Sequence, residues 1–482
     1  MGIESKLATH DRYQIELKLG YTLDPSRRKN KYNVDLFMFI PRSLGMNQTS
    51  YTKDRFYEDI QGYIRFKTPA FTFEELNDPA NSRSPLTRMK KFMEHPEEIK
   101  RIIAEMKLFA CTVRVALRTD ITSLRQDIKR QQTGDIELKL KKVCQGLKTS
   151  LSEFRSLHTI LHNNKINDNL KNAFRHTDEY MGIAIDGLLN SFNNTITTSF
   201  MSPTQSGALS DIATPLIISE YEHRKEQGFA IYEKDGANEP FLYRKGVLKK
   251  IITSILFLKT HTHEATVVAK DFIFAISAGI AMIIATVVTL WAGHKYGATS
   301  LPFVLAIVIG YMAKDRIKDW LKLIFSKRMT RWFADYKVDI MDPANDAKIG
   351  VCKQAFSFIS ESKVPPKILE MRKHGTPHHF WIEEEIIKYE KDVILNPSAI
   401  LKAHTRMRGV TDIIRFNMHR FLERMDEPYE RRKALDPATR EILDFKFART
   451  YHIVLVLKLD EDIRKVRIYL NQNGILKIEE AI

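Results

Sequence analysis

The sequence predicts a membrane protein in which a two-helix transmembrane hairpin interrupts a larger α+β cytoplasmic part. That part consists of a mainly helical bundle and antiparallel strands at both chain ends. Three observations lead to this fold class. Two apolar runs lie close together, from Phe272 to Gly293 and from Ala298 to Ala313. Long stretches before them carry apolar residues at helical spacing. Short stretches near both chain ends are typical of strands, since Tyr13–Tyr21 alternates with a period of two and Tyr451–Leu459 is a run of β-prone residues.

The first apolar run contains no charged side chain and is long enough for a membrane-spanning helix, which needs about 20 apolar residues. The second run is shorter, and Lys314 follows it directly. A lysine at the end of a short span can place its ammonium group at the membrane interface. We therefore expect two spans, joined by a turn from His294 to Gly297.

Positive charge gathers on both sides of the predicted hairpin. The chain has a net charge of +16, and the segment from Arg244 to Arg328 holds thirteen Lys or Arg against four acidic residues, a difference of +9. Of these bases, only Lys295 lies in the turn. This positive-inside pattern places both termini in the cytoplasm, and we expect a bacterial-type inner membrane. Anionic headgroups account for much of the charge, so nucleic acid is not an expected partner.

Small residues recur at intervals of four in both apolar runs. They are Ser277, Ala281 and Ala285 in the first run, and Ala306 and Gly310 in the second. This spacing lets helix backbones approach each other closely. We expect these residues to pack the two helices of one hairpin together. The alternative is that they associate between copies of the chain, which would give a homo-oligomer.

A second set of residues is expected at the membrane interface. Aromatic side chains are enriched near the ends of membrane spans. After the second span, apolar and basic residues follow one another at helical spacing, which is typical of a helix lying on an anionic membrane surface. The predicted interface residues are Trp291, Tyr311, Lys314, Arg316, Lys318, Trp320 and Lys322.

Three long stretches before the hairpin carry apolar residues at helical spacing. They extend from Ile99 to Ile128, from Ile136 to Leu161 and from Leu170 to Phe192. Short breaks separate them, which favours an antiparallel bundle over an oligomeric coiled coil built on the same apolar stripes. After the bundle we expect a linker, then a hairpin formed by Phe229–Tyr232 and Phe241–Tyr243, and then a basic amphipathic helix that leads into the membrane.

Strands are predicted at both chain ends. Tyr13–Tyr21 and Tyr32–Ile40 are expected to form an antiparallel pair, followed by a helix at Tyr51–Phe66. At the other end, Tyr451–Leu459 and two strands flanking the turn at Asn471–Gly474 are expected to form a three-stranded antiparallel sheet. We expect the strands of the two ends to share one sheet or two packed sheets.

The region after the hairpin is expected to contain two helices, one at Ile382–Val393 and one from Asn396 to about Met425. The predicted divisions of the chain follow from these elements. They are an N-terminal α/β segment with a β-hairpin at 1–93, a helical bundle at 94–200, a linker and hairpin at 201–250, the basic-flanked transmembrane hairpin with its interfacial helix at 251–328, and a C-terminal α+β cytoplasmic region at 329–482.

The chain contains no motif for nucleotide binding, zinc proteolysis, serine hydrolysis or kinase chemistry. Its three cysteines stand far apart, which argues against a disulfide framework and fits a reducing compartment. Two histidine groups, one at His261 and His263 and one at His374, His378 and His379, lack partners at a recognised metal-site spacing. We therefore assign no catalytic, cofactor-binding or metal-binding residue.

The sequence favours a membrane-tethered cytoplasmic protein that binds or senses a partner and has no identifiable catalytic site. One alternative is an oligomeric membrane effector or channel formed by the hairpins. Another is a membrane-tethered hydrolase or nuclease with a dispersed site. The expected partners are a bilayer with anionic headgroups and an unidentified cytoplasmic protein.

Overall fold

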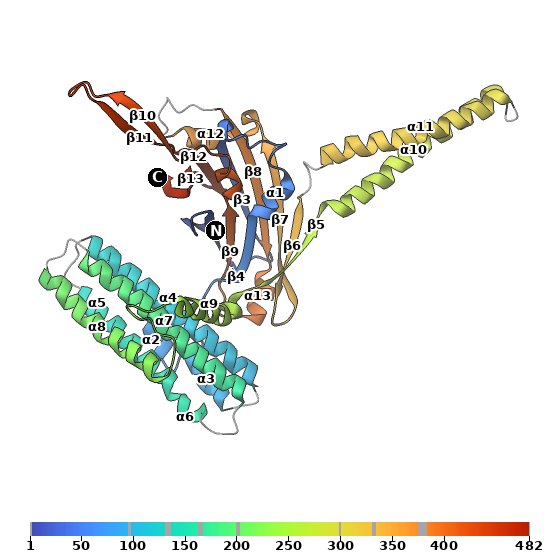
Figure 1. Ribbon diagram of the computed structural model, residues 1–482. Helices are drawn as coiled ribbons and strands as arrows, with labels where there is room; N and C mark the ends of the chain where they lie inside the picture. The colour runs from blue at the N-terminus through green and yellow to red at the C-terminus, as the bar shows by residue number, and fades with distance from the viewer. Residues whose placement is uncertain are drawn as a thin grey trace. The chain divides into compact units, whose positions relative to one another are not determined.

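The computed structural model describes residues 2–94, 98–130, 136–161, 167–198, 203–297, 300–329, 334–374 and 383–481 (Figure 1). The chain divides into two compact units. Unit 1 comprises Met1–Arg65, Leu258–Thr405 and Gly409–Ile482, and unit 2 comprises Phe66–Phe257 with Arg406–Arg408. Unit 1 carries the sheets and the apolar helical hairpin, and unit 2 is helical over most of its described length.

Unit 1 contains two large sheets. The four-stranded sheet has the order β1-β2-β9-β4 and the eight-stranded sheet has the order β14-β13-β12-β3-β8-β7-β6-β5. The strands of the first are β1 (Ile3–Thr9), β2 (Gln14–Thr22), β4 (Ile60–Phe66) and β9 (Gly409–Asn417). Those of the second are β3 (Asn30–Pro41), β5 (Lys259–Glu264), β6 (Tyr336–Asp342), β7 (Ala347–Ile359), β8 (Glu384–Leu395), β12 (Tyr451–Leu459), β13 (Asp462–Asn471) and β14 (Gly474–Ala481).

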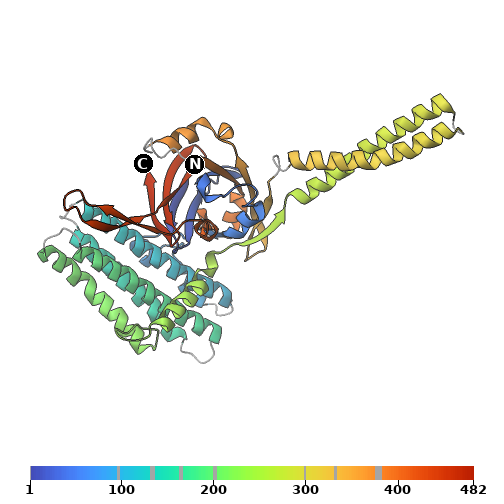
Figure 2. The same ribbon diagram turned by 45° about the horizontal axis from the view of Figure 1, so that its top comes forward.

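Strands from the two chain ends meet in this unit, as Figure 2 shows in blue and red. β3 pairs antiparallel with β12, so that Phe39 lies opposite Val454. The two sheets pack face to face, because Leu17 of β2 and Leu455 of β12 line the same apolar cavity of about 30 Å³. The predicted pairing of the first two strands is wrong, since β2 pairs with β1 and β9 instead of β3.

A buried ion pair lies between the two sheets. The Lys391 ammonium of β8 is 2.6 Å from the Asp412 carboxylate of β9, and the two side chains are 3 % and 0 % exposed. The Tyr21 hydroxyl of β2 donates a hydrogen bond of 3.3 Å to the same carboxylate. Burial raises the pKa of Tyr21, and the neighbouring Asp412 charge raises it further. The hydroxyl therefore stays protonated and remains a donor.

The opposite face of the eight-stranded sheet has an apolar cluster of its own. Phe37, Val454 and Val456 pack there against Ile368 of α12 (Pro366–Lys373). The other short elements of unit 1 are α1 (Lys53–Asp59), α13 (Pro397–Ala403), α14 (His419–Leu422) and a separate two-stranded arm of β10 (Tyr429–Leu435) and β11 (Ile442–Ala448).

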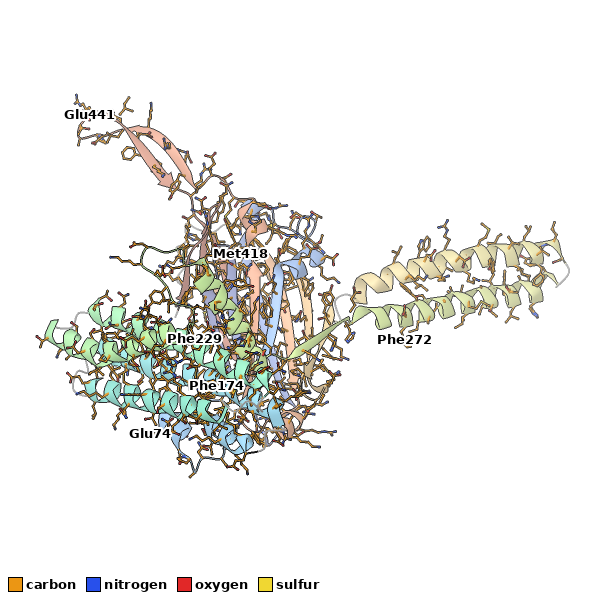
Figure 3. The ribbon with its side chains drawn as sticks, turned by 60° about the horizontal axis from the view of Figure 1, so that its bottom comes forward. Glu74, Phe174, Phe229, Phe272, Met418 and Glu441 are labelled. Atoms are coloured by element: carbon orange, nitrogen blue, oxygen red, sulfur yellow. The ribbon has the colours of Figure 1, made fainter. Side chains whose placement is uncertain are left out.

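The apolar runs form a hairpin of two long helices, α10 (Thr266–Tyr296) and α11 (Leu301–Met329). The strands on either side of it, β5 and β6, pair antiparallel, so that Glu264 lies opposite Tyr336. Both ends of the hairpin therefore emerge at neighbouring strands of one sheet. Figure 3 shows side chains projecting outward along both helices, with Phe272 in the first turns of α10.

The predicted two-helix transmembrane hairpin is wrong. Among the described residues, only one helical segment, Phe274–Tyr296, is long and apolar enough to cross a membrane. In α11 the uncharged segment from Leu301 to Ala313 covers about 20 Å at roughly 1.5 Å per residue, less than the ~30 Å hydrocarbon core. The predicted interfacial helix after it is a continuation of α11. Lys322 of this basic half lies 4.9 Å from the ring of Phe274, beside the apolar start of α10.

Several expected helices in unit 1 are strands. Residues 60–66 form β4 because they join the edge of the four-stranded sheet beside β9. The helix expected at Ile382–Val393 is strand β8, which lies between β3 and β7. Burial alternates along β8 from Lys388 to Leu395, but the buried position 391 holds a lysine, so the sequence lacks the apolar alternation that identifies a strand. The long helix expected from Asn396 is only α13, and β9 and α14 follow it.

Unit 2 contains the three predicted long helices, α4 (Ile99–Lys129), α5 (Ile136–Ser156) and α7 (Asp168–Thr197). Their aromatic side chains stack in the core, with ring centroids 5.5 Å apart for Phe109 and Phe154 and 4.6 Å apart for Phe154 and Phe174. The other α-helices in the described part of the unit are α2 (Phe73–Asn77), α3 (Pro85–Met93), α6 (His158–Leu161), α8 (Pro203–Glu226) and α9 (Glu239–Thr253).

The predicted linker and hairpin between residues 201 and 250 are also wrong. Helix α8 occupies the linker and continues through Pro215. The second strand expected for this hairpin, Phe241–Tyr243, lies at the start of α9 instead. The basic amphipathic helix expected after it ends at Thr253, before β5. Tertiary burial explains the formation of α8, because Leu209 and Ala213 are buried against the bundle.

Buried ion pairs also join the helices of unit 2. Arg155 of α5 donates to Asp178 of α7 at 3.0 Å and to Glu220 of α8 at 2.8 Å. His223 of α8 donates to the same Asp178 at 2.7 Å. Burial alone would raise the pKa of Asp178, but the hydrogen bond from His223 and the charge of Arg155 lower it overall. The ionised carboxylate therefore stabilises the folded bundle.

We predict that Lys391→Met destabilises unit 1 by about 3–5 kcal/mol, because it leaves the Asp412 carboxylate buried without its partner. The double variant Lys391→Met with Asp412→Leu should regain most of this loss, since it removes both charges. Native-state hydrogen exchange of the β8 and β9 amides measures both effects. Equal losses in the single and double variants would contradict the prediction.

Unit 2 is expected to lose stability in acid. Asp178 has a lowered pKa in the folded state, so its contribution is present above its ordinary pKa near 3.8 and is lost as the pH falls through the folded value. Asp178→Asn should reduce the free energy of unfolding at neutral pH by about 1–3 kcal/mol. It should also make the free energy of unfolding depend less on pH in the acid range. Circular dichroism of helix content during acid titration tests this. Asp211→Asn, on the exposed side of α8, is the matched control.

Candidate functional site

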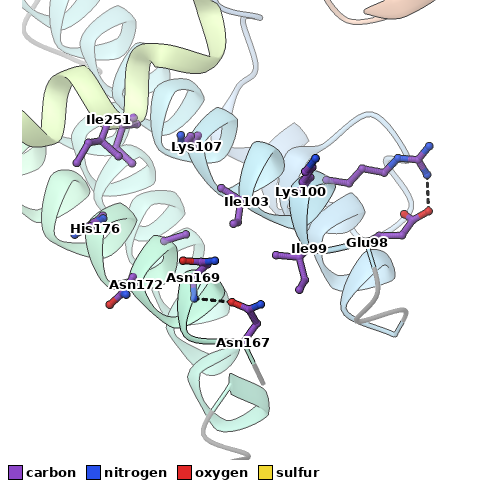
Figure 4. Close-up of a pocket in the computed structure, with 13 residues that line it drawn as sticks. Glu98, Ile99, Lys100, Ile103, Lys107, Asn167, Asn169, Asn172, His176 and Ile251 are labelled. Atoms are coloured by element: carbon purple, nitrogen blue, oxygen red, sulfur yellow. Dashed lines mark hydrogen bonds and ion pairs between the residues drawn. The ribbon is translucent and has the colours of Figure 1, made fainter. Parts of the chain in front are cut away.

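An open groove with a volume of about 920 Å³ lies in unit 2. It lies between the first turns of α4, the first turns of α7 and the end of α9 (Figure 4). The volume falls within the range of about 300–1,000 Å³ that is usual for small-molecule sites. Its lining residues are Glu98, Ile99, Lys100, Arg101, Ile103, Lys107, Asn167, Asn169, Asn172, Ala173, His176, Ile251 and Ile252.

Helical spacing places these side chains in the groove. Ile99 and Ile103 are four residues apart on α4 and therefore lie on one face of that helix. The polar side chains of α7 repeat at intervals of three and four, at Asn169, Asn172 and His176. Asn167 caps α7 by accepting a hydrogen bond of 2.8 Å from the Asn169 amide. The result is an apolar lining with polar groups on both sides.

The groove carries an excess of positive charge. Arg101 pairs with Glu98 at 2.5 Å. Lys107 donates a hydrogen bond of 3.2 Å to the Ser254 hydroxyl. Within the described part of the chain, neither Lys100 nor Lys107 has a carboxylate at ion-pair distance. Two cations of the groove are therefore left without an anionic partner among the residues that the structure describes.

Burial changes the titration of two groups in the groove. It lowers the pKa of Lys107. It also lowers the pKa of His176, and the nearby Arg244 charge lowers it further. The His176 ring is therefore neutral at neutral pH and can both donate and accept a hydrogen bond. Lys107 is partly withdrawn from water, which strengthens any interaction that it makes with an anion.

The structure places the predicted small residues inside the hairpin. Ser277, Ala281 and Gly310 are buried, and Ala285 and Ala306 are half-buried. A Cβ atom at Gly310 would lie in ordinary van der Waals contact with Val288 of α10, at 3.8 Å, so Gly310 faces α10. This surface is used to pack α10 against α11.

The predicted interface residues lie on the outer surface of the hairpin. Trp291, Tyr311 and Trp320 are exposed. Lys314 lies 3.9 Å from the Tyr311 ring centroid, and Lys295 lies 4.9 Å from that of Trp291. Arg316 is exposed, and Lys318 and Lys322 are half-buried.

Neither histidine group forms a metal site in the described part of the chain, where no group of three or more candidate ligands comes together. His261 and His263 lie two apart on β5 and are exposed, so they share one face of a strand. His374 follows α12, and its predicted companions His378 and His379 lie outside the described residues.

Sequence reasoning missed the groove and the pair of Lys391 with Asp412. The groove is assembled from three helices whose lining residues are spread from Glu98 to Ile252. Only a bundle of known topology could bring them together. Comparisons of the chain with models of protein families, with curated proteins and with solved structures found no match.

We predict that Gly310→Leu separates α10 from α11, because a larger side chain does not fit at this buried position; the expected loss is about 1–3 kcal/mol. Gly279→Leu is the matched control on α10, since a side chain there would point into open space. Hydrogen exchange of the α10 and α11 amides in detergent should rise for the first variant and stay the same or fall for the second. Equal exchange in the two variants would contradict the packing role of Gly310.

Proposed function

We propose that this protein is a membrane-anchored interaction protein, anchored by the distal hairpin, which we define as Met282 to Ala313. The supporting observation is the exposure of its large apolar side chains. Ile283 is 65 % exposed, Leu290 is 69 % exposed and Ile309 is 64 % exposed. Soluble proteins rarely expose a contiguous apolar surface of this kind, and such patches are usually covered by a membrane or a partner.

The sheet of unit 1 supports an anchor that enters the bilayer and returns on the same side. Because β5 and β6 pair with each other, the hairpin leaves and returns at one place. An anchor that crossed once and ended on the far side would break this pairing. The strands of both chain ends also belong to unit 1, so both termini stay on the side of β5 and β6.

The positive charge of α11 supports the cytoplasmic side of the membrane as the side on which β5 and β6 lie. The half of α11 nearest β6 carries Lys314, Arg316, Lys318 and Lys322. Basic residues next to a membrane segment favour the cytoplasmic side and attract anionic headgroups, by about 1 kcal/mol each near the surface. The distal hairpin would thus lie in lipid while this basic half lies at the headgroups.

An interaction role is supported by the proportions of the chain. The hairpin takes up residues 266–329, and the remainder forms two folded units. Unit 2 contains a groove of small-molecule size, and its asparagine, lysine and isoleucine side chains are suited to binding.

Vesicle flotation tests the anchor. The full chain should float with vesicles of phosphatidylcholine and phosphatidylglycerol. A triple variant, Ile283→Gln, Leu290→Gln and Ile309→Gln, should stay at the bottom of the gradient. Each change removes roughly 1.5–3 kcal/mol of apolar burial. These side chains are exposed, so folding of the units should be unaffected.

The matched control is the double variant Leu435→Gln and Ile442→Gln on the β10–β11 arm, where the two side chains are 60 % and 71 % exposed. It should float like the unchanged protein. The proposal fails if the unchanged protein does not float. It also fails if, without detergent, it forms a soluble dimer that the triple variant abolishes, because a second copy would then cover the hairpin.

A further inference from the structure

We propose that the groove between α4, α7 and α9 is a binding site for an anionic amphiphile, a small molecule with a phosphate or carboxylate head and an apolar chain. This site lies in unit 2 and does not depend on the hairpin, so it goes beyond the proposed membrane anchoring. It rests on three features of the groove: its size, its unpaired cations and its apolar lining.

The head group is recognised by charge. Lys100 and Lys107 both line the groove, and neither has an anionic partner among the described residues. The hydrogen bond to Ser254 fixes the position of the Lys107 ammonium but leaves two of its three donors for a ligand. A charge-assisted hydrogen bond to phosphate or carboxylate is roughly twice as strong as a neutral one.

The side of the groove formed by α7 provides neutral hydrogen-bonding groups. Asn169, Asn172 and His176 line it at helical spacing, opposite the lysines of α4 (Figure 4). Amide groups can donate to an anionic head without adding charge. An anion between the two helices would therefore meet cations on one side and amide donors on the other.

The apolar lining is too extensive for an inorganic anion. Ile99, Ile103 and Ile251 are half-buried, and Ile252 is buried, so the groove exposes aliphatic surface between its polar walls. A free phosphate ion would leave this surface in contact with water. An attached alkyl chain would cover it, at about 25 cal/mol for each Å² removed from water. The volume of about 920 Å³ has room for both parts of such a molecule.

Titration calorimetry of the full chain, held in nanodiscs of zwitterionic lipid, tests the site. Octyl phosphate should bind at least about tenfold more tightly than inorganic phosphate, which lacks the chain, or octanol, which lacks the charge. A short-chain phosphatidic acid distinguishes a lipid source from a soluble alkyl phosphate. Hydrogen exchange should show protection at the first turns of α4 and α7.

Lys107→Met should weaken octyl phosphate binding by about tenfold, as expected for the loss of a hydrogen bond between charged groups. Lys148→Met removes the same charge from an exposed position on α5, outside the groove, and is the matched control. Ile103→Ser should weaken octyl phosphate binding but leave that of inorganic phosphate unchanged. Circular dichroism verifies that each variant is folded.

Three results would overturn the proposal. One is equal binding of octyl phosphate and inorganic phosphate. Another is ligand protection outside α4, α7 and α9. The last is equal binding by the Lys107→Met and Lys148→Met variants. The flotation test compares hairpin variants in which the groove is unchanged, and calorimetry compares groove variants in which the hairpin is unchanged, so failure of either proposal can be recognised without the other.

Discussion

The ion pair of Lys391 with Asp412 is the constraint on which unit 1 depends. Taking two charges out of water costs several kcal/mol for each ion, and only a close and well-oriented contact offsets that. The pair joins β8 to β9, and these strands lie in different sheets. It therefore selects one alignment of the two sheets. The eight-stranded sheet also carries β5 and β6, so the position where the hairpin leaves unit 1 follows from the same packing.

Under the proposed membrane anchoring, the sheet of unit 1 would restrict the topology of the hairpin. The pairing of β5 with β6 returns the chain to its starting point, whatever depth the helices reach. The small residues of α10 and α11 pack these two helices together, and the large apolar side chains lie on the outer surface of the hairpin. Lipid is the environment that covers such a surface without a further protein. Unit 2 is then free to bind a ligand of its own, and the lysines and asparagines of its groove favour an anionic one.

Much of the secondary structure could be predicted from local patterns. The apolar repeats of α4, α5 and α7 and the alternation of β2 were sufficient, and a continuous run of β-prone residues identified β12, which is buried on both faces. Prediction failed where tertiary packing decides. Strand β8 carries Lys391 at a buried position and so lacks the apolar alternation of a strand, and α8 continues through Pro215 because one of its faces, with Leu209 and Ala213, is buried. The candidate groove could not be predicted, since its residues meet only after three helices have packed.

The sequence by itself determined the apolar hairpin, the basic residues beside it and the three long helices, because composition and periodicity act over a few neighbouring residues. Only the tertiary structure decided which strands pair, since β3 reaches β12 across most of the chain. It also decided that the hairpin is not a pair of equal spans. The charged half of α11 lies beside the apolar half of α10, and this mismatch becomes visible only when the two helices are placed in register.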